Sequence, residues 1–230
     1  RFDGLCANNI WVRDINTARE HQLTLSTGYY GPHQFTPNGN KLAFMAKDVC
    51  PRSTSTDSQM KQQVAVAPIK KYCWNLMTLD IEKALKEPQE PEIAISCNDG
   101  QLSNPVWLDN GNIAVLKQKQ NNWQIVKYMP GALTEKALYS PNSLNIYYLG
   151  YLAQQKRLYI LAINSKGEHI IETLDQSGQL QSSNTIKHDM SLSPFHMIKP
   201  FYDPFNDQLA FANGKQLYSL SLDGAINKLT

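Results

Sequence analysis

The sequence lacks a strong charge of either sign. Its 22 Lys and Arg residues are nearly balanced by 20 Asp and Glu residues, which leaves a formal net charge of +2 over 230 residues. Proteins that bind nucleic acid or an anionic membrane surface electrostatically carry a basic patch or a large positive charge. We therefore expect this fragment to bind no nucleic acid.

Long apolar runs are also missing. No window approaches the roughly 18 apolar residues of a membrane-spanning helix, and no signal peptide is visible. The chain begins with Arg1 rather than Met, which favours a processed chain or an excised soluble piece of a longer protein. We expect membrane attachment only through an N-terminal segment outside this sequence.

Signatures of catalysis and of metal or cofactor binding are sparse. The sequence has no cysteine pair at two-residue spacing and no histidine pair at ligand spacing, which disfavours zinc. It also has no Gly-x-Ser-x-Gly elbow, phosphate loop or dinucleotide fingerprint. Asp80, Asp175 and Asp223 end strand-like runs just before turns, where Asp commonly stabilises the turn. We predict a chain that is not an enzyme and needs no metal or cofactor.

A hairpin pattern recurs along the chain. Between Phe35 and Phe44, an aromatic residue is followed by a Pro-Asn-Gly corner and then by Leu-Ala-Phe, which is typical of two strands joined by a tight turn. Further copies span 107–115, 151–160 and 202–211; the last keeps the aromatic residue, the proline and Leu-Ala-Phe. Repeats of roughly 40 to 50 residues built from short strands indicate a β-propeller.

Each hairpin copy is followed by further strand-like runs. The candidates for third strands are 10–14, 74–80, 123–128, 169–175 and 216–223, and those for outer fourth strands are 20–24, 92–96, 134–139, 181–187 and 225–230. The sequence thus contains five candidate pairs of outer strands but only four candidate inner hairpins. We therefore predict an all-β, single-domain propeller over 1–230 with about five visible four-stranded blades, the first incomplete at its N-terminus. The predicted blades cover 1–27, 28–98, 101–140, 144–188 and 195–230.

A polar insertion, 48–73, interrupts the second predicted blade where a short turn is usual. Cys50 and Cys73 bracket it, and they would meet at the mouth of the loop if the flanking runs are adjacent antiparallel strands. Closing that loop with a disulfide would stabilise the fold by about 3 kcal/mol and would require an oxidising compartment. Two free thiols in a cytosolic protein are the alternative. Cys6 and Cys97 are either a second bonded pair or two small buried hydrophobic residues.

Four residues are candidates for ligand contacts at the central channel of a propeller. His33 and His196 each precede an inner hairpin, and Asn104 and Tyr147 complete the set. Ligands are held in concave sites of this kind. A structural role for polar residues at the blade ends is the alternative.

The hairpin pattern resembles the TolB-type propeller repeat. The resemblance rests on the hairpin itself, on the preceding prolines Pro32, Pro105 and Pro200, and on the Ile-Trp-Val-x-Asp strand from Ile10 to Asp14. That repeat is found in TolB, in the propellers of prolyl-oligopeptidase-like peptidases, and in the periplasmic parts of CadC/ToxR-like transmembrane transcription regulators. The Gln- and Asn-rich repeats and the insertion bracketed by cysteines look most like the last group.

The resemblance implies a function in recognition. In a CadC-like regulator, an N-terminal winged helix-turn-helix binds DNA and one membrane helix links it to a periplasmic domain, so this chain would be the periplasmic sensor. Its partner would be an unidentified protein, peptide or small-molecule signal that favours one of two states by differential affinity. A TolB-like envelope scaffold for protein interactions and the gating propeller of a serine peptidase are the alternatives.

Overall fold

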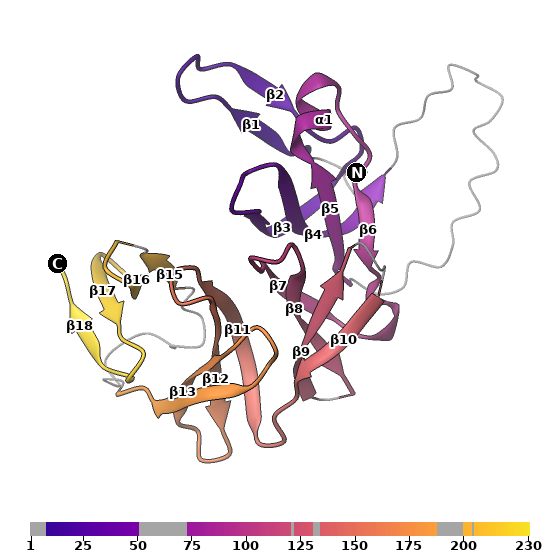
Figure 1. The fold of residues 1–230 in the computed structure, drawn as a ribbon. Helices are drawn as coiled ribbons and strands as arrows, with labels where there is room; N and C mark the ends of the chain where they lie inside the picture. Colours follow the sequence, from indigo (N-terminus) through magenta and orange to yellow (C-terminus); the bar gives the residue numbers. More distant parts are fainter. Residues whose placement is uncertain (1–7, 51–72, 121, 131–133, 188–199, 204) are drawn as a thin grey trace, which may run out of the picture. The chain divides into compact units, whose positions relative to one another are not determined.

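The computed structural model describes residues 8–50, 73–120, 122–130, 134–187, 200–203 and 205–230, with the backbone alone for 48–50. Within these residues the chain is nearly all β-structure. Its strands form four antiparallel four-stranded sheets and one two-stranded sheet (Figure 1). The four-stranded sheets are blades of a β-propeller, so the predicted fold class is confirmed.

The chain divides into two compact units, and the first spans Arg1–Ser103. Its elements are β1 (Trp11–Arg13), β2 (Glu20–Gln22), β3 (Thr27–Phe35), β4 (Lys41–Cys50), β5 (Asn75–Asp80), α1 (Ile81–Lys86), β6 (Glu92–Ile95) and the short 3-10 helix η1 (Cys97–Asp99). Strands β3 to β6 form one blade in chain order, while β1 and β2 form the two-stranded sheet. These two strands match the outer pair predicted for the incomplete first blade.

The second unit spans Asn104–Thr230 and holds three blades, the first of which begins just before it. The strands are β7 (Leu102–Trp107), β8 (Ile113–Lys119), β9 (Asn122–Met129), β10 (Thr134–Tyr139), β11 (Leu144–Leu152), β12 (Arg157–Asn164), β13 (His169–Leu174), β14 (Leu180–Thr185), β15 (Phe201–Asp203), β16 (Gln208–Asn213), β17 (Gln216–Leu220) and β18 (Ile226–Lys228). Each blade pairs its strands in chain order. A single propeller domain over the whole chain stays a prediction.

All four predicted inner hairpins are present, and each turn contains a residue with positive φ. In the first two copies this residue is a glycine, Gly39 at +74° and Gly111 at +76°. In the copies that lack glycine at this turn, Lys156 and Asp207 adopt φ values of +54° and +50°. The turn geometry is therefore kept even where the residue type that adopts it most easily is absent.

Neighbouring blades of the second unit share hydrophobic cores. The largest core joins side chains of β7, β8 and β9 to side chains of β11, β12 and β13. Its buried members are Val106, Leu108, Ala114, Leu116, Ile125, Ile146, Leu149, Tyr151, Leu158, Ile160, Ala162 and Leu174. Because such cores pack at nearly crystalline density, they hold the two blades in fixed positions. The turns at the ends of these strands are therefore held next to one another.

The aspartates at strand ends stabilise turns, as predicted. Asp80 caps α1 by accepting a 3.1 Å hydrogen bond from the Lys83 main-chain N–H. The Asp175 carboxylate accepts N–H groups of the following turn, and the hydrogen bond from the Ser177 hydroxyl is the main cause that lowers the pKa of Asp175. Among the described residues, no helix combines the length and apolar character needed to cross a bilayer.

The structure corrects the predicted disulfide pairing. Cys73 is bonded to Cys97, with Cα atoms 5.8 Å apart, and not to Cys50. Cys73 lies just before β5 and Cys97 just after β6, and these strands are antiparallel neighbours, so both cysteines come to the same end of the pair. Cys50 instead lies beyond the β4–β5 ladder, where its backbone pairs with Thr27 of β3.

The observed bond also excludes the second predicted pair, since Cys97 already has a partner. Cys6 lies outside the described residues. The Cys97 main-chain N–H donates a 3.0 Å hydrogen bond to the Asn75 side-chain oxygen, which holds the cysteine beside the start of β5. A disulfide in this position is consistent with folding in an oxidising, extracytoplasmic compartment.

Candidate ligand pocket between two blades

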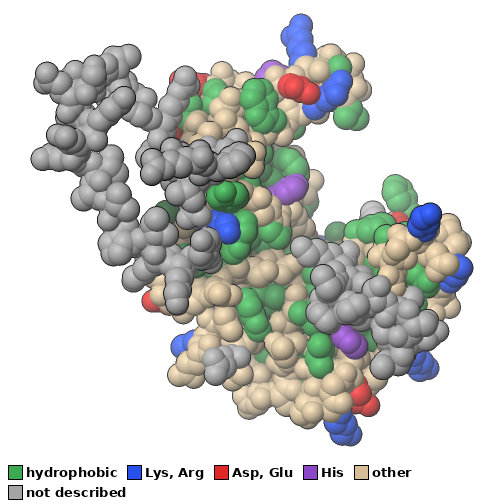
Figure 2. Space-filling model, turned by 180° about the vertical axis from the view of Figure 1, so that it is seen from behind, with side chains coloured by type: hydrophobic (Ala, Val, Ile, Leu, Met, Phe, Trp, Pro, Cys, Tyr) green, Lys and Arg blue, Asp and Glu red, His purple; other side chains and the backbone are tan. Residues whose placement is uncertain are grey.

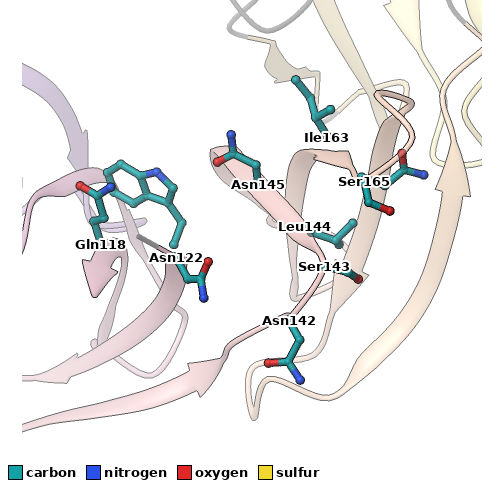
Figure 3. Close-up of a pocket in the computed structure, with 10 residues that line it drawn as sticks. Gln118, Asn122, Asn142, Ser143, Leu144, Asn145, Ile163 and Ser165 are labelled. Atoms are coloured by element: carbon teal, nitrogen blue, oxygen red, sulfur yellow. The ribbon is translucent and has the colours of Figure 1, made fainter. Parts of the chain in front are cut away.

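The strand order brings three turns of the second unit to one end of two blades. Each strand of a blade reverses the direction of the previous one, so the turn between the second and third strands and the connection to the next blade lie at the same end. In the blades β7–β10 and β11–β14 these segments follow Lys119 at the end of β8, Tyr139 at the end of β10 and Asn164 at the end of β12. A pocket with a volume of about 450 Å³ opens among their flanking residues (Figure 3).

The pocket has a largely amide and hydroxyl lining. The residues around it are Gln118, Asn122, Trp123, Asn142, Ser143, Leu144, Asn145, Ile163, Asn164 and Ser165. Figure 3 shows Gln118 and Asn122 on one side and Ile163 and Ser165 on the other, with the start of β11 between them. None of the ten lining side chains carries a carboxylate, an imidazole, a thiol or a cation.

One of the five amides has a structural role. The Asn164 side-chain oxygen accepts the main-chain N–H groups of Lys166 and Glu168, each at 3.0 Å. Its NH₂ group donates to the Glu168 carboxylate at 2.8 Å. These bonds close the β12–β13 turn, a standard use of Asn in turns. The Asn164 amide is therefore already hydrogen-bonded and forms a fixed part of the wall.

The other four amides have no such partners. Within the described residues, the side chains of Gln118, Asn122, Asn142 and Asn145 make no hydrogen bond. Each primary amide offers two N–H donors and one carbonyl oxygen. Two segments distant in the sequence, 118–122 and 142–145, thus place unpaired amide donors and acceptors around one pocket. Such an arrangement can recognise an uncharged polar ligand.

Trp123 adds an apolar surface to the same wall. It is partly exposed and packs against the core shared by the two blades. Its backbone pairs with Gln118 across the β8–β9 hairpin, so the indole and the Gln118 amide come from directly opposed positions. Because the hairpin lies on a packed core, the wall is anchored before any ligand arrives.

Of the four predicted channel residues, one lies in the first unit, two lie in the second unit, and one lies outside the described residues. His33 is in β3 of the first unit, where it lines a separate pocket of about 500 Å³ together with Trp11, Tyr30 and Phe35. Asn104 lies in β7 with φ of +51°, and Tyr147 lies in β11. A channel shared by these residues stays a prediction.

The structure describes the surroundings of Tyr147 but not those of His196, the other two residues predicted to contact a ligand. The Tyr147 hydroxyl lies 3.2 Å from Nδ1 of His169, the rings meet edge to face, and burial raises the pKa of Tyr147. This contact lies inside one blade and provides an ordinary structural use for the hydroxyl. His196 lies outside the described residues.

The four free amides are not among the residues predicted from the sequence to contact a ligand. Their signal is the abundance of Asn and Gln near the blade turns, which the sequence shows but which is usually explained by turn formation. In the described part of the chain, no three His, Cys, Asp or Glu side chains lie close enough together to hold a metal ion. The predicted independence from metals stays a prediction.

The chain is similar in fold to several solved structures. Neither a protein-family model nor a curated protein sequence matches it. TolB from Acinetobacter baumannii matches with a TM-score of 0.62 and 15% identity, over 94% of this chain and 46% of that one. The fold is a TolB-like β-propeller. Its strands thus follow a known architecture, although the chain spans less than half the length of that TolB.

Other solved structures share the TolB-like propeller fold. Oligogalacturonate lyase from Vibrio parahaemolyticus matches with a TM-score of 0.59 and 12% identity, over 96% of this chain and 60% of that one. The extracellular domain of a one-component system from B. thetaiotaomicron matches with a TM-score of 0.56 and 13% identity, over 96% of this chain and 26% of that one. At these identities the likeness concerns the fold alone, because one propeller fold serves many functions.

Proposed function

We propose that this chain is a non-catalytic, extracytoplasmic sensor domain of a membrane-bound transcriptional regulator, and that it binds an uncharged polar ligand in the pocket between the blades β7–β10 and β11–β14. The observation that carries this proposal is the set of four amide side chains without hydrogen-bond partners: Gln118, Asn122, Asn142 and Asn145. Exposed amides that converge on one concavity are suited to selective binding.

The composition of the pocket favours binding over catalysis. General acid–base and nucleophilic catalysis need titratable or activated groups such as His, Glu, Cys or Lys at the reacting atoms. The two lining serines, Ser143 and Ser165, are exposed and have no His or carboxylate beside them in the lining. The pocket therefore offers hydrogen bonds and an indole surface, which are means of recognition.

Two further observations support the extracytoplasmic and regulatory parts of the proposal. The Cys73–Cys97 disulfide suits an oxidising compartment. A similar propeller forms the extracellular domain of a one-component system from B. thetaiotaomicron. On the face drawn in Figure 2, the described Lys and Arg side chains do not form a large basic patch.

The walls of the pocket come from two blades, and this gives the ligand a way to act. Asn122 and Asn145 lie near the starts of β9 and β11, outside the shared core, so a ligand that bonds to both favours one arrangement of these strand ends. An equilibrium between two states shifts by the ratio of the ligand's affinities for them, and a tenfold ratio corresponds to about 1.4 kcal/mol. Binding would in this way change the arrangement passed to the rest of the receptor.

An envelope scaffold is the second candidate function. It is favoured by the similarity in fold to TolB from Acinetobacter baumannii. That match has a TM-score of 0.62, compared with 0.56 for the extracellular domain from B. thetaiotaomicron. In that case an exposed segment of a partner protein would occupy the same pocket. The two functions share the site and differ in whether occupancy changes gene expression.

Side-chain amide NMR tests the binding site directly. The NH₂ signals of Asn and Gln are assigned, and a library of uncharged polar compounds and peptides is added. We expect ligands to shift the signals of Asn122 and Asn145, and the double variant N122A/N145A to lose binding. N227A is the matched control, because Asn227 is exposed in β18 and does not line the pocket. Ligands that shift only signals elsewhere would refute the site.

The regulatory part needs a measurement in the host cell. The N122A/N145A change is placed in the chromosomal gene, and transcripts are compared with those of the N227A strain after addition of the ligand found by NMR. A sensor predicts that the transcriptional response is lost in the double variant alone. An unchanged response, together with loss of a co-purifying envelope protein, would favour the scaffold.

A further inference from the structure

The amide pocket has a chemical character narrow enough to indicate its ligand class. We infer that it binds a neutral saccharide, with the amides of Gln118, Asn122, Asn142 and Asn145 bonding to sugar hydroxyls and Trp123 contacting the apolar face of a ring. This inference rests on the proposed binding function of the pocket. Four features of the pocket support it. The polar groups are amides, the lining side chains carry no charge, much of the main chain in the walls is already paired between strands, and an indole lies among the lining residues.

The first feature is the match between amides and hydroxyls. A sugar hydroxyl both donates and accepts a hydrogen bond, and a primary amide carries donors and an acceptor in one plane. Two adjacent hydroxyls can therefore bond to the oxygen and the nitrogen of the same side chain. The free amides Asn122, Asn142 and Asn145 are all exposed at the pocket, so they can be reached by a ligand from solvent.

The second feature is the absence of charge from the lining. A phosphate or carboxylate ligand is normally met by Arg or Lys, which form the strong charge-assisted bonds. Two basic residues flank Gln118 on β8: Lys117 is only 4% exposed and pairs with Glu135 at 2.5 Å, while Lys119 is exposed but does not line the pocket. On the other side, the Glu168 carboxylate is bonded to the Asn164 amide. No charged side chain lines the pocket itself, so an uncharged ligand is favoured.

The third feature is the state of the main chain in the walls. A bound peptide commonly extends a sheet by pairing with a free strand edge. At this pocket Gln118 is paired with Trp123, Asn145 with Ile163, and Leu144 with Asn164. The hairpins have thus already paired much of the backbone around the pocket, and recognition falls mainly to side chains. This favours a ligand rich in hydroxyls over an extended peptide.

The fourth feature is the apolar part of the lining. Trp123 is partly exposed, and Leu144 and Ile163, which are also partly buried, line the same pocket. One face of a pyranose ring carries C–H groups while its edge carries hydroxyls, so it needs an apolar surface beside polar groups. An indole provides a large rigid surface of this kind. The volume of about 450 Å³ lies within the range of small-molecule sites.

An array of oligosaccharides and peptides, followed by calorimetry, tests the inference. The array carries neutral oligosaccharides, acidic oligosaccharides and peptides that are acetylated and amidated at their ends. We expect neutral oligosaccharides to bind in preference to both other groups. In calorimetry with the best neutral probe, N122A and N145A should each weaken binding by about 3- to 10-fold, the loss expected for a hydrogen bond to a neutral ligand.

Two further variants complete the series. W123F keeps an aromatic ring and should retain binding better than W123L, which removes it; thermal melting confirms that both are folded. N227A should bind like the wild type. A preference for acidic oligosaccharides, or equal effects of W123F and W123L, would contradict the neutral, ring-stacked mode of binding.

The remaining outcomes separate this inference from the proposed function. If only peptides bind and N122A and N145A abolish that binding, the saccharide inference is wrong while the pocket remains a binding site. If a neutral saccharide binds N122A and N145A as well as it binds N227A, the ligand lies elsewhere and the proposed pocket is wrong. If no saccharide binds at all, the inference is overturned.

Discussion

The Tyr139 hydroxyl donates a 2.7 Å hydrogen bond to the Glu172 carboxylate and thereby joins β10 of one blade to β13 of the next. Glu172 is only 5% exposed, and its other oxygen accepts a 2.9 Å bond from the Ser183 hydroxyl. Burial and then the carboxylate raise the pKa of Tyr139. The two hydroxyls therefore compensate for burial of an acidic group between blades.

Removing the Tyr139 hydroxyl should destabilise the protein. Y139F leaves one oxygen of a buried carboxylate without its donor, which costs about 1–3 kcal/mol of unfolding free energy. Urea denaturation measures the change. Y202F is the matched control, because Tyr202 donates to Asp207 at a more accessible position, and it should cost less. An equal decrease in the free energy of unfolding in Y139F and Y202F would show that the contact between blades stabilises the protein no more than an exposed hydrogen bond does.

Stability should fall at alkaline pH. Burial raises the pKa values of Tyr148, Tyr151 and Tyr159, and burial with Asp207 raises the pKa of Tyr202 to about 12. An unfolded tyrosine ionises near pH 10. Below that pH the tyrosines are protonated in both the folded and the unfolded chain, so they do not make the free energy of unfolding depend on pH. Above it the unfolded state loses its protons first, so stability decreases as pH rises through the folded pKa values.

Absorbance at 295 nm checks the tyrosine prediction, since it reports phenolate formation. The native protein should show fewer ionised tyrosines near pH 10 to 11 than the urea-unfolded chain. The midpoint of urea unfolding should fall over the same interval. Matching titration curves for the folded and unfolded chains would contradict the prediction.

The disulfide should be found between Cys73 and Cys97. Peptide mapping of oxidised protein under non-reducing conditions should yield this linked pair, and C50S should leave it intact. C97A should lower the free energy of unfolding by about 3 kcal/mol, because the bond closes a loop with a sequence separation of 24 residues. A linked peptide of Cys50 and Cys73 would instead restore the original prediction.

A methyl group at position 150 should be poorly tolerated. Gly150 lies opposite Tyr159 in the β11–β12 ladder, and an added Cβ would overlap the Tyr159 ring. That ring is buried beside Tyr148, so it has little room to move, and overpacking of this kind costs about 1–3 kcal/mol. G150A should thus unfold at lower urea concentration. In a Y159L background the same change should cost less, and an equal cost there would exclude the overlap as the cause.

Much of the fold can be predicted from the sequence because its signals are local. The hairpin from Phe35 to Phe44 encodes its own turn and the apolar strand that follows. The run from Ile81 to Lys86 forms α1, and its cap, Asp80, directly precedes it in the sequence. The alternation of apolar and polar residues and the choice of turn residues are signals that extend over only a few positions. Strands can therefore be recognised even in the hairpin copy 151–160, which contains Lys156.

The disulfide pairing depends on register, which local patterns do not specify. The prediction placed Cys50 and Cys73 opposite one another at the mouth of a loop. In the structure β4 continues past its ladder with β5 and pairs with β3 at Thr27. Cys97 follows a different strand, and only the pairing of β5 with β6 brings it to Cys73.

The pocket could not be predicted because its residues come from three separate segments. Asn122, Asn142 and Ser165 each look like ordinary turn residues in the sequence. Their convergence depends on how two blades pack, and that packing is set by core residues elsewhere in the strands. The Asn164 amide is hydrogen-bonded through both its oxygen and its nitrogen, whereas the Asn145 amide is free, and this contrast appears only in three dimensions.

Strand β7 has a practical consequence for dissecting the molecule. The compact second unit begins at Asn104, but β7 begins at Leu102, so the boundary falls inside the innermost strand of a blade. A truncated protein that starts at Asn104 would lose the first two residues of that strand. Anyone who wishes to express the ligand pocket by itself should therefore start the gene fragment at or before the codon for Leu102.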